Sequence, residues 1–209
     1  EASLAGIVRA WQAAKEANIK LICGARFQFQ EGFQLLLVAP CRQAYSELCS
    51  LISYSRLHST KGNYALSVEA LQRFNRHLLA IYLPESKCGA TGLKDLKALF
   101  PARLWLGVAL HCTAQQEAYY LKHYDLACRY QLPLVAAPHI LMHCRSRHPL
   151  FDVLRAIRLH STVGQLGRNT LMNSEYYIKP RELLSRDYPQ ALLDESDKLA
   201  ARCQFDLKE

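Results

Sequence analysis

The sequence lacks several features that define large classes of protein. No segment approaches the roughly 18 uninterrupted apolar residues that a membrane helix requires, and the first ten residues, EASLAGIVRA, lack the pattern of a secretory signal peptide. Eight cysteines are present, but no two form a CxxC pair and most lie in apolar segments. We therefore expect a soluble, cytoplasmic protein with no membrane partner and with reduced, unlinked thiols.

Common catalytic motifs are also absent. The sequence has no Walker A loop, no GxSxG elbow and no GxGxxG turn. Nucleotidyl transfer needs clustered carboxylates that hold two metal ions, but the 18 acidic residues are scattered. Asp194, Glu195 and Asp197 come nearest to a cluster, and their polar neighbours predict a solvated helix face. We therefore expect no two-metal site for nucleotidyl transfer in this chain.

Basic residues are in excess. The 209 residues carry a formal net charge of +8, and half of them are apolar, which suffices for one sizeable core. The charge favours contact with a polyanion such as DNA. Alternatively, the basic residues only make the surface soluble.

Strand and helix patterns alternate over residues 20–160. Apolar runs on both sides of Glu31 and Gly32 predict a hairpin. Strands are predicted in HLLAIYLP, RLWLGVAL and LPLVAAP, and helices in LKDLKALF, over residues 113–130 and beyond Pro180. This alternation predicts an α/β domain around a mostly parallel sheet or barrel. The first helix has no strand before it, which indicates a fragment.

Two helices carry apolar stripes that we expect to be buried. The stripe of the 113–130 helix consists of Tyr120, Leu121, Tyr124 and Cys128. The stripe of a later helix, which has Pro149 near its start, consists of Leu150, Val153, Leu154 and Ile157.

The segment HILMHCRSRH concentrates potential zinc ligands just after a predicted strand. These ligands are His139, His143, Cys144 and His148. Donors from other strand ends are few: His111 and Cys112 follow one strand, whereas Arg26 follows another and would repel a cation. The alternative interpretation is a set of ordinary loop histidines.

A basic stripe follows the same segment. It contains Arg145, Arg147, Arg155, Arg158 and Arg168, with Asp152 as the single acid among them. The stripe could contact DNA phosphates without reading sequence. It could equally dock against an acidic neighbouring domain, or simply be solvated.

The segment VAAPHILMHCRSRHPLFDVLRAIRLHSTVGQLG closely resembles the end of the PHP domain (polymerase and histidinol phosphatase) of bacterial error-prone DNA polymerases of the C family. SLAGIVRAWQAAKEANIKLICGARF resembles an earlier part of that domain. The sequence from Leu171 onward resembles the helical passage into the polymerase core. The resemblance implies an incomplete, distorted β/α barrel of the PHP type over residues 1–168, without its first strand, and a helical extension over residues 169–209.

The chain departs from this family where the family binds metal. Glu1 stands in place of a histidine and Arg26 in place of a glutamate, while His139 and Leu141 stand where an Asp-x-His motif is expected. The resemblance therefore implies a metal-free, catalytically inactive domain with a structural or interaction-mediating role. Two alternatives stay open: a phosphoesterase or proofreading exonuclease with a zinc site rebuilt from His111, Cys112, His139 and His143, or a DNA-binding module.

The same resemblance implies partners for the intact protein. It would extend primed DNA with Mg²⁺ held by carboxylates outside this chain, so no cofactor is expected in the segment itself. The sliding clamp and damage-response accessory proteins are further expected partners.

Overall fold

The computed structural model describes residues 1–84 and 90–208. The strands are β1 (Gly24–Gln28), β2 (Gln34–Val38), β3 (Leu79–Leu83), β4 (Leu104–Val108) and β5 (Leu134–Ala136). The α-helices are α1 (Ile7–Glu16), α2 (Arg42–Leu57), α3 (Val68–Leu71), α4 (Leu93–Leu99), α5 (Gln116–Tyr130), α6 (His148–Arg158), α7 (Arg181–Asp187) and α8 (Gln190–Arg202). Three short 3₁₀ helices are η1 (Arg145–Arg147), η2 (Val163–Gln165) and η3 (Gly167–Asn169).

The five strands form one sheet in the order β1-β2-β3-β4-β5. β1 and β2 form the predicted antiparallel hairpin, and β2 is also antiparallel to β3. β3, β4 and β5 are parallel, so every strand except β2 runs in the same direction. The mixed α/β class is confirmed, but the described strands form an open sheet with β1 and β5 at its edges, and a closed barrel is not shown.

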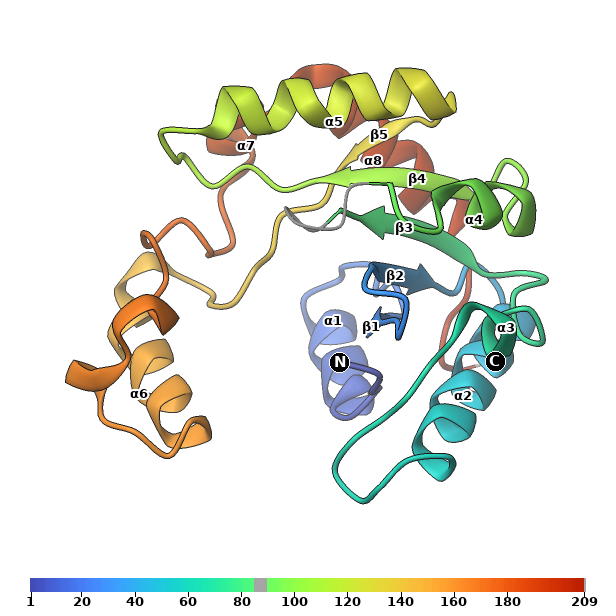
Figure 1. Ribbon diagram of the computed structural model, residues 1–209, viewed down its shortest axis with the longest axis horizontal. Coiled ribbons are helices and arrows are strands. Elements are labelled where there is room, and N and C mark those ends of the chain that lie inside the picture. Colours follow the sequence, from blue (N-terminus) through green and yellow to red (C-terminus); the bar gives the residue numbers. More distant parts are fainter. Residues whose placement is uncertain (85–89, 209) are drawn as a thin grey trace.

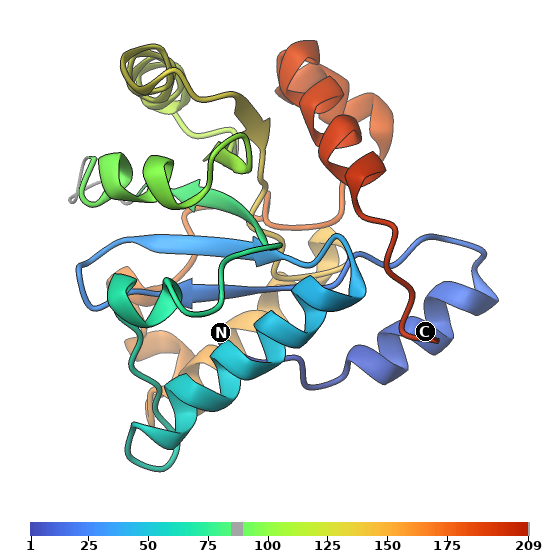
Figure 2. The ribbon, with the colours of Figure 1, turned by 90° about the vertical axis from the view of Figure 1, so that its right-hand side faces the viewer.

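One face of the sheet carries the main core. Alternate residues of each strand point to this face, as the two-residue period of a strand requires, and they pack against α2, α3, α4 and α5, which lie on one side of the sheet in Figure 2. Fully buried members include Phe27, Leu35, Tyr82 and Leu106. The central parallel strands are buried on both faces: every residue of β4 and all but the last residue of β3 are buried, as expected for parallel strands covered on both sides.

α8 covers part of the opposite face. Leu199 and Cys203 pack there against residues of β2, β3, β4 and β5. The indole Nε1 of Trp105 donates a hydrogen bond of 2.9 Å to Glu195. Asp194 and Asp197 are exposed as expected, but Glu195 is half-buried, so the prediction of a wholly solvated acidic face was wrong for this residue.

The predicted stripe of α5 was also wrong. Leu121 and Tyr124 are 53% and 50% exposed, whereas His123 and Ala127 are the buried residues of the helix. The apolar spacing identified the helix correctly, but not the side that meets the sheet.

The thiols are free throughout the described part of the chain. Cys23 and Cys203 are buried, whereas Cys112 and Cys128 are exposed, so burial is less general than the sequence indicated. Cys88 lies outside the described residues. None of the described helices has the length and apolar character needed to cross a membrane.

Residues 138–178, which we call the α6 arm, leave the sheet after β5 and return beside their own starting point. The peptide nitrogens of Leu141 and Met142 donate to the carbonyl oxygen of Tyr176 at 2.8 and 3.1 Å, and Met142 forms a parallel bridge with Tyr177. Between these two segments the arm carries η1, α6, η2 and η3, which stand apart from the sheet in Figure 1.

Candidate functional site

A groove of about 860 Å³ lies on the same sheet face as α8, in the part that α8 leaves uncovered. It is at the carboxyl ends of the parallel strands, where sites of α/β proteins are commonly built. Gly107 forms part of its floor, and a Cβ there would lie 2.7 Å from Leu83 and 2.9 Å from Ile81. The polar residues that line the groove are Arg26, Gln34, His111, Tyr119, His139 and Tyr176, and no described lining residue is acidic.

Three of the four positions at which the family resemblance implies a replaced metal ligand, Glu1, Arg26 and His139, meet beside this groove. One nitrogen of the Arg26 guanidinium donates to Glu1 Oε1 at 2.9 Å, and another lies 3.1 Å from His139 Nε2. The hydroxyl of Tyr64 donates to the other oxygen of Glu1 at 3.3 Å and accepts from the peptide nitrogen of Gln28 at 2.7 Å. Because a guanidinium only donates, His139 accepts through Nε2 and is held as a neutral imidazole.

The histidines at the groove have lowered pKa values. Burial and then the nearby charge of Arg26 lower the pKa of His139. Burial lowers the pKa of His111 to about 4, with smaller contributions from His139 and Lys179. The ring of His111 stacks on Tyr176 at a centroid distance of 4.0 Å, so a residue of the α6 arm helps to bury it. Both imidazoles are therefore neutral at pH 7.

The fourth of these positions, Leu141, makes a backbone contact. The peptide nitrogen of Leu141 donates to Tyr176 in the paired segments of the arm, and its side chain is not part of the groove lining.

The four residues of the alternative zinc site are not brought together. His111 and His139 both line the groove, but His143 is exposed. The thiol of Cys112 lies 3.7 Å from the ammonium of Lys179. Among the described residues, this quartet is not a group whose ligand atoms converge.

The other residues of the HILMHCRSRH segment have local partners. Cys144 Sγ lies 3.2 Å from Ser146 Oγ. His148 Nδ1 lies 2.7 Å from Ser174 Oγ, and its Nε2 lies 3.6 Å from the carboxylate of Asp152. Both contacts lie within the α6 arm.

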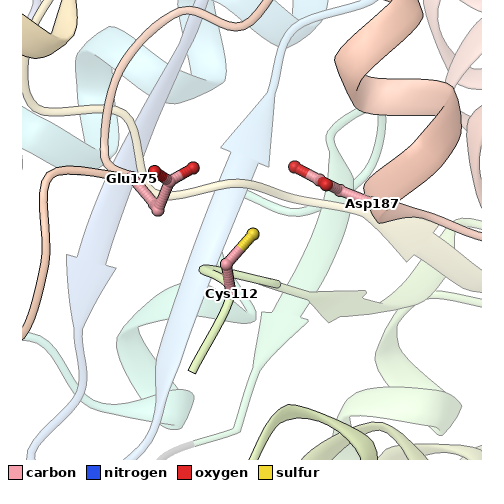
Figure 3. Close-up of side chains that lie close together, drawn as sticks. All are labelled: Cys112, Glu175 and Asp187. Carbon is pink, nitrogen blue, oxygen red and sulfur yellow. The ribbon is translucent and has the colours of Figure 1, made fainter. Parts of the chain in front are cut away.

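A different group of potential ligands was not predicted. Cys112, Glu175 and Asp187 place their ligand atoms within 4.8 Å of one another (Figure 3). The ammonium of Lys179 lies among them, 2.9 Å from Glu175 and 2.6 Å from Asp187. The side chain of Lys179 is only 5% exposed, and hydrogen bonds to both carboxylates raise its pKa against the effect of burial. This cluster therefore already contains its own cation.

The arginines of the basic stripe differ in their surroundings. Arg145 pairs with Glu175 and lies over the ring of Tyr177, and Arg155 lies over Phe151. The other three, Arg147, Arg158 and Arg168, are exposed and form no ion pair with any described residue.

No protein-family model matches the chain. Over its whole length it is 44% identical to the error-prone DNA polymerase of Pseudomonas aeruginosa and 40% identical to that of Methylococcus capsulatus, in each case covering 20% of the relative. Over 99% of its length it is 40% identical to the error-prone DNA polymerase of Pseudomonas fluorescens, again covering 20%. The chain is thus homologous to a segment of these polymerases and spans about one fifth of their length.

Proposed function

We propose that this chain is a PHP-type domain of an error-prone DNA polymerase that has lost its metal site and serves as a structural element of that enzyme. The observation that carries the proposal is the Glu1–Arg26–His139 cluster, in which three residues at positions of metal ligands in the family bind one another. The homology to error-prone DNA polymerases supports the polymerase context.

The cluster is chemically unsuited to hold a catalytic metal. The guanidinium of Arg26 keeps its positive charge in proteins, so it would repel a divalent ion at this place. It also occupies a carboxylate oxygen of Glu1 and Nε2 of His139, which are the groups a metal would need. The ion pair and hydrogen bond instead connect residue 1, β1 and the segment after β5.

By analogy with its relatives, the intact protein would extend primed DNA in the bacterial cytoplasm, using Mg²⁺ bound outside this chain. The sliding clamp and damage-response accessory proteins are proposed partners. We assign residues 1–168 to the PHP-type barrel, completed by a strand outside this chain, and residues 169–209 to the passage toward the polymerase core.

The test uses the complete polymerase. We expect primer extension with Mg²⁺, no metal that copurifies with the PHP region, and no metal-dependent cleavage from the 3′ end of DNA. A matched pair of variants, His139→Ala and His143→Ala, separates genuine activity from a contaminating nuclease. Metal-dependent 3′ cleavage that either substitution abolishes would show that the site was rebuilt, and the proposal would fail.

A second candidate function is contact with DNA phosphates through the α6 arm. It is favoured by Arg147, Arg158 and Arg168, which are exposed and have no acidic partner among the described residues. If these residues bind phosphates, the DNA-binding constant of the complete polymerase should depend less on salt in the Arg158→Ala variant. The magnitude of the slope of log K for DNA binding against log salt should fall by about 1. Arg73→Ala, which alters a guanidinium placed over Tyr54 on another part of the surface, is the control. An unchanged slope would contradict this candidate.

A further inference from the structure

The orientation of α6 is the reverse of that expected for an amphipathic helix in water. Leu150, Val153, Leu154 and Ile157 are 46%, 43%, 57% and 65% exposed. Their spacing of three and four residues makes them neighbours along one side of the helix. Ala156, on the other side, is only 4% exposed. The four exposed residues, which we call the α6 stripe, therefore form one apolar strip on the outside of the arm.

The one acidic residue of α6 is turned away from this stripe. The side chains of His148 and Asp152 are only 20% and 18% exposed, and His148 Nε2 lies 3.6 Å from the carboxylate of Asp152. His148 Nε2 and Asp152 Oδ1 are both buried. The outer side of α6 therefore carries no negative charge of its own.

Two arginines border the α6 stripe. Arg158 follows Leu154 by four residues, a spacing that places the two side chains next to each other on the helix surface. Arg147 is the N-cap residue of α6 and precedes Leu150 by three residues. Both arginines are exposed and form no ion pair with any described residue. The outer side of α6 thus combines an apolar strip with positive charges that no described acidic residue neutralises.

This combination determines the chemistry of a surface that would fit it. DNA phosphates would pair with the arginines but leave the α6 stripe uncovered, and contiguous exposed apolar residues mark contact sites. A purely apolar surface would cover the stripe but bury Arg158 without a counter-charge, which is costly. A second copy of the arm would place arginines against arginines. An acidic amphipathic segment fits both features, because its apolar residues cover the stripe and its carboxylates reach the arginines.

The relatives indicate where such a segment would come from. The chain covers 20% of each of the error-prone DNA polymerases compared above, so about four fifths of each relative lies outside the matched segment. A region of the same polypeptide is held near the arm at a high effective concentration, whereas a separate protein must bind from dilute solution. A weak ionic and apolar contact is therefore favoured within one chain.

We propose that the α6 stripe docks an acidic amphipathic segment from another region of the complete polymerase. The inference rests on the proposed function, since it takes the chain to be part of such a polymerase. The carboxylates of the segment pair with Arg147 and Arg158, and its apolar side chains cover the stripe. This docking competes with the second candidate function, because it keeps the same arginines away from DNA.

The test is site-specific photo-crosslinking in the complete polymerase. A benzoylphenylalanine in place of Leu154 should crosslink, on irradiation, to a peptide of the same polypeptide outside these 209 residues, with Asp or Glu beside apolar residues. Mass spectrometry of mixed isotope-labelled and unlabelled protein separates crosslinks within one chain from those between two copies. The matched control is the same group in place of Leu57, which is 81% exposed at the end of α2 and should not give that peptide. A crosslink from position 154 to a second copy, another protein, DNA or lipid would overturn the proposal, as would a peptide without acidic residues or no crosslink.

Charge reversal tests the ionic part of the contact. Arg158→Glu should lower the yield of that crosslink about fivefold, because it places like charges against each other. Arg73→Glu, at an exposed arginine on another part of the surface, should leave the yield unchanged. One acidic residue of the crosslinked peptide, when replaced by Lys, should restore the yield in the Arg158→Glu variant. Equal yields for the two arginine variants, or no restoration, would contradict the proposal. Primer extension and metal content, measured on the same preparations, report separately on the proposed function.

Discussion

The sheet body and the α6 arm use similar apolar residues in opposite ways. In the body, Leu35, Tyr82 and Leu106 are wholly buried, and helices cover both faces of the sheet. In the arm, every residue of the apolar stripe of α6 is more than 40% exposed. The body encloses its own core, whereas the arm leaves the apolar stripe of α6 exposed.

The largest effect is expected where the arm joins the body. Lys179→Met would remove the buried ammonium that Glu175 and Asp187 share. The exposed Arg145 beside Glu175 and the exposed Arg186, 3.9 Å from Asp187, would replace it only in part, so the change should cost about 3–5 kcal/mol of unfolding free energy.

The control is Lys198→Met, because Lys198 is exposed and pairs with Glu195 on the surface of α8. That change should cost far less, because an ion pair at an exposed position contributes little to stability. Urea unfolding of both variants measures the difference, and similar losses would show that the junction does not stabilise the chain.

A matched pair of leucines compares the two regions directly. Leu106→Ala, in β4, removes a fully buried side chain and should cost about 2–5 kcal/mol. Leu154→Ala, in α6, removes a side chain that is 57% exposed and should change the stability of the 209-residue chain by less than about 1 kcal/mol. Urea denaturation curves provide both values. A loss at Leu154 as large as that at Leu106 would mean that the arm is already packed without further residues.

The junction should also respond to pH through His111. Its folded-state pKa of about 4 lies below the unfolded value of about 6.5. Between these values the unfolded chain binds more protons, so stability should fall as the pH is lowered from about 6.5 toward 4. His111→Asn should weaken this dependence, measured as unfolding midpoints across the window. An NMR titration midpoint of His111 near its unfolded value would contradict the burial of this ring.

The smallest effects are expected at the exposed arginines. Arg158→Ala should change the unfolding free energy by less than about 0.5 kcal/mol, because this side chain is exposed and has no ion pair with any described residue. Arg103→Ala is the comparison within the body, where the guanidinium donates to the carbonyl oxygens of Asn75 and Leu78 at 2.8 Å. Loss of the Arg103 guanidinium should lower the unfolding free energy more than Arg158→Ala does, because it would leave two partly buried carbonyl groups without their donor. Thermal or urea unfolding ranks the two variants.

Much of the fold could be predicted from local patterns. The apolar runs around Glu31 and Gly32 identified the hairpin, and the alternation of strands and helices identified the mixed α/β class. Closure of a barrel could not be tested from these patterns, because closure depends on which strands meet at the sheet edges. The buried sides of α5 and α6 were predicted wrongly, since apolar spacing identifies a stripe but not the surface that covers it.

The candidate site was predicted in part, through the family resemblance. It directed attention to Glu1, Arg26 and His139 as substituted positions, and the structure brings these three side chains together. Lys179 had no such signal. Cys112 is far from Lys179 in the sequence, and Asp187 lies at the end of α7. Glu175 and Lys179 are four residues apart but lie outside any helix, so helical periodicity could not have paired them.

The sequence by itself determined the order of strands and helices and the basic character of the chain, because these depend on residue type and near-neighbour spacing. Only the tertiary structure decided that Arg26 binds Glu1 and His139, that Lys179 serves as the cation of a buried acidic cluster, and that α6 turns its apolar stripe outward. Each of these depends on the position of a side chain relative to groups far away in the chain. That position follows from how the whole sheet and its helices pack, and no local pattern contains it.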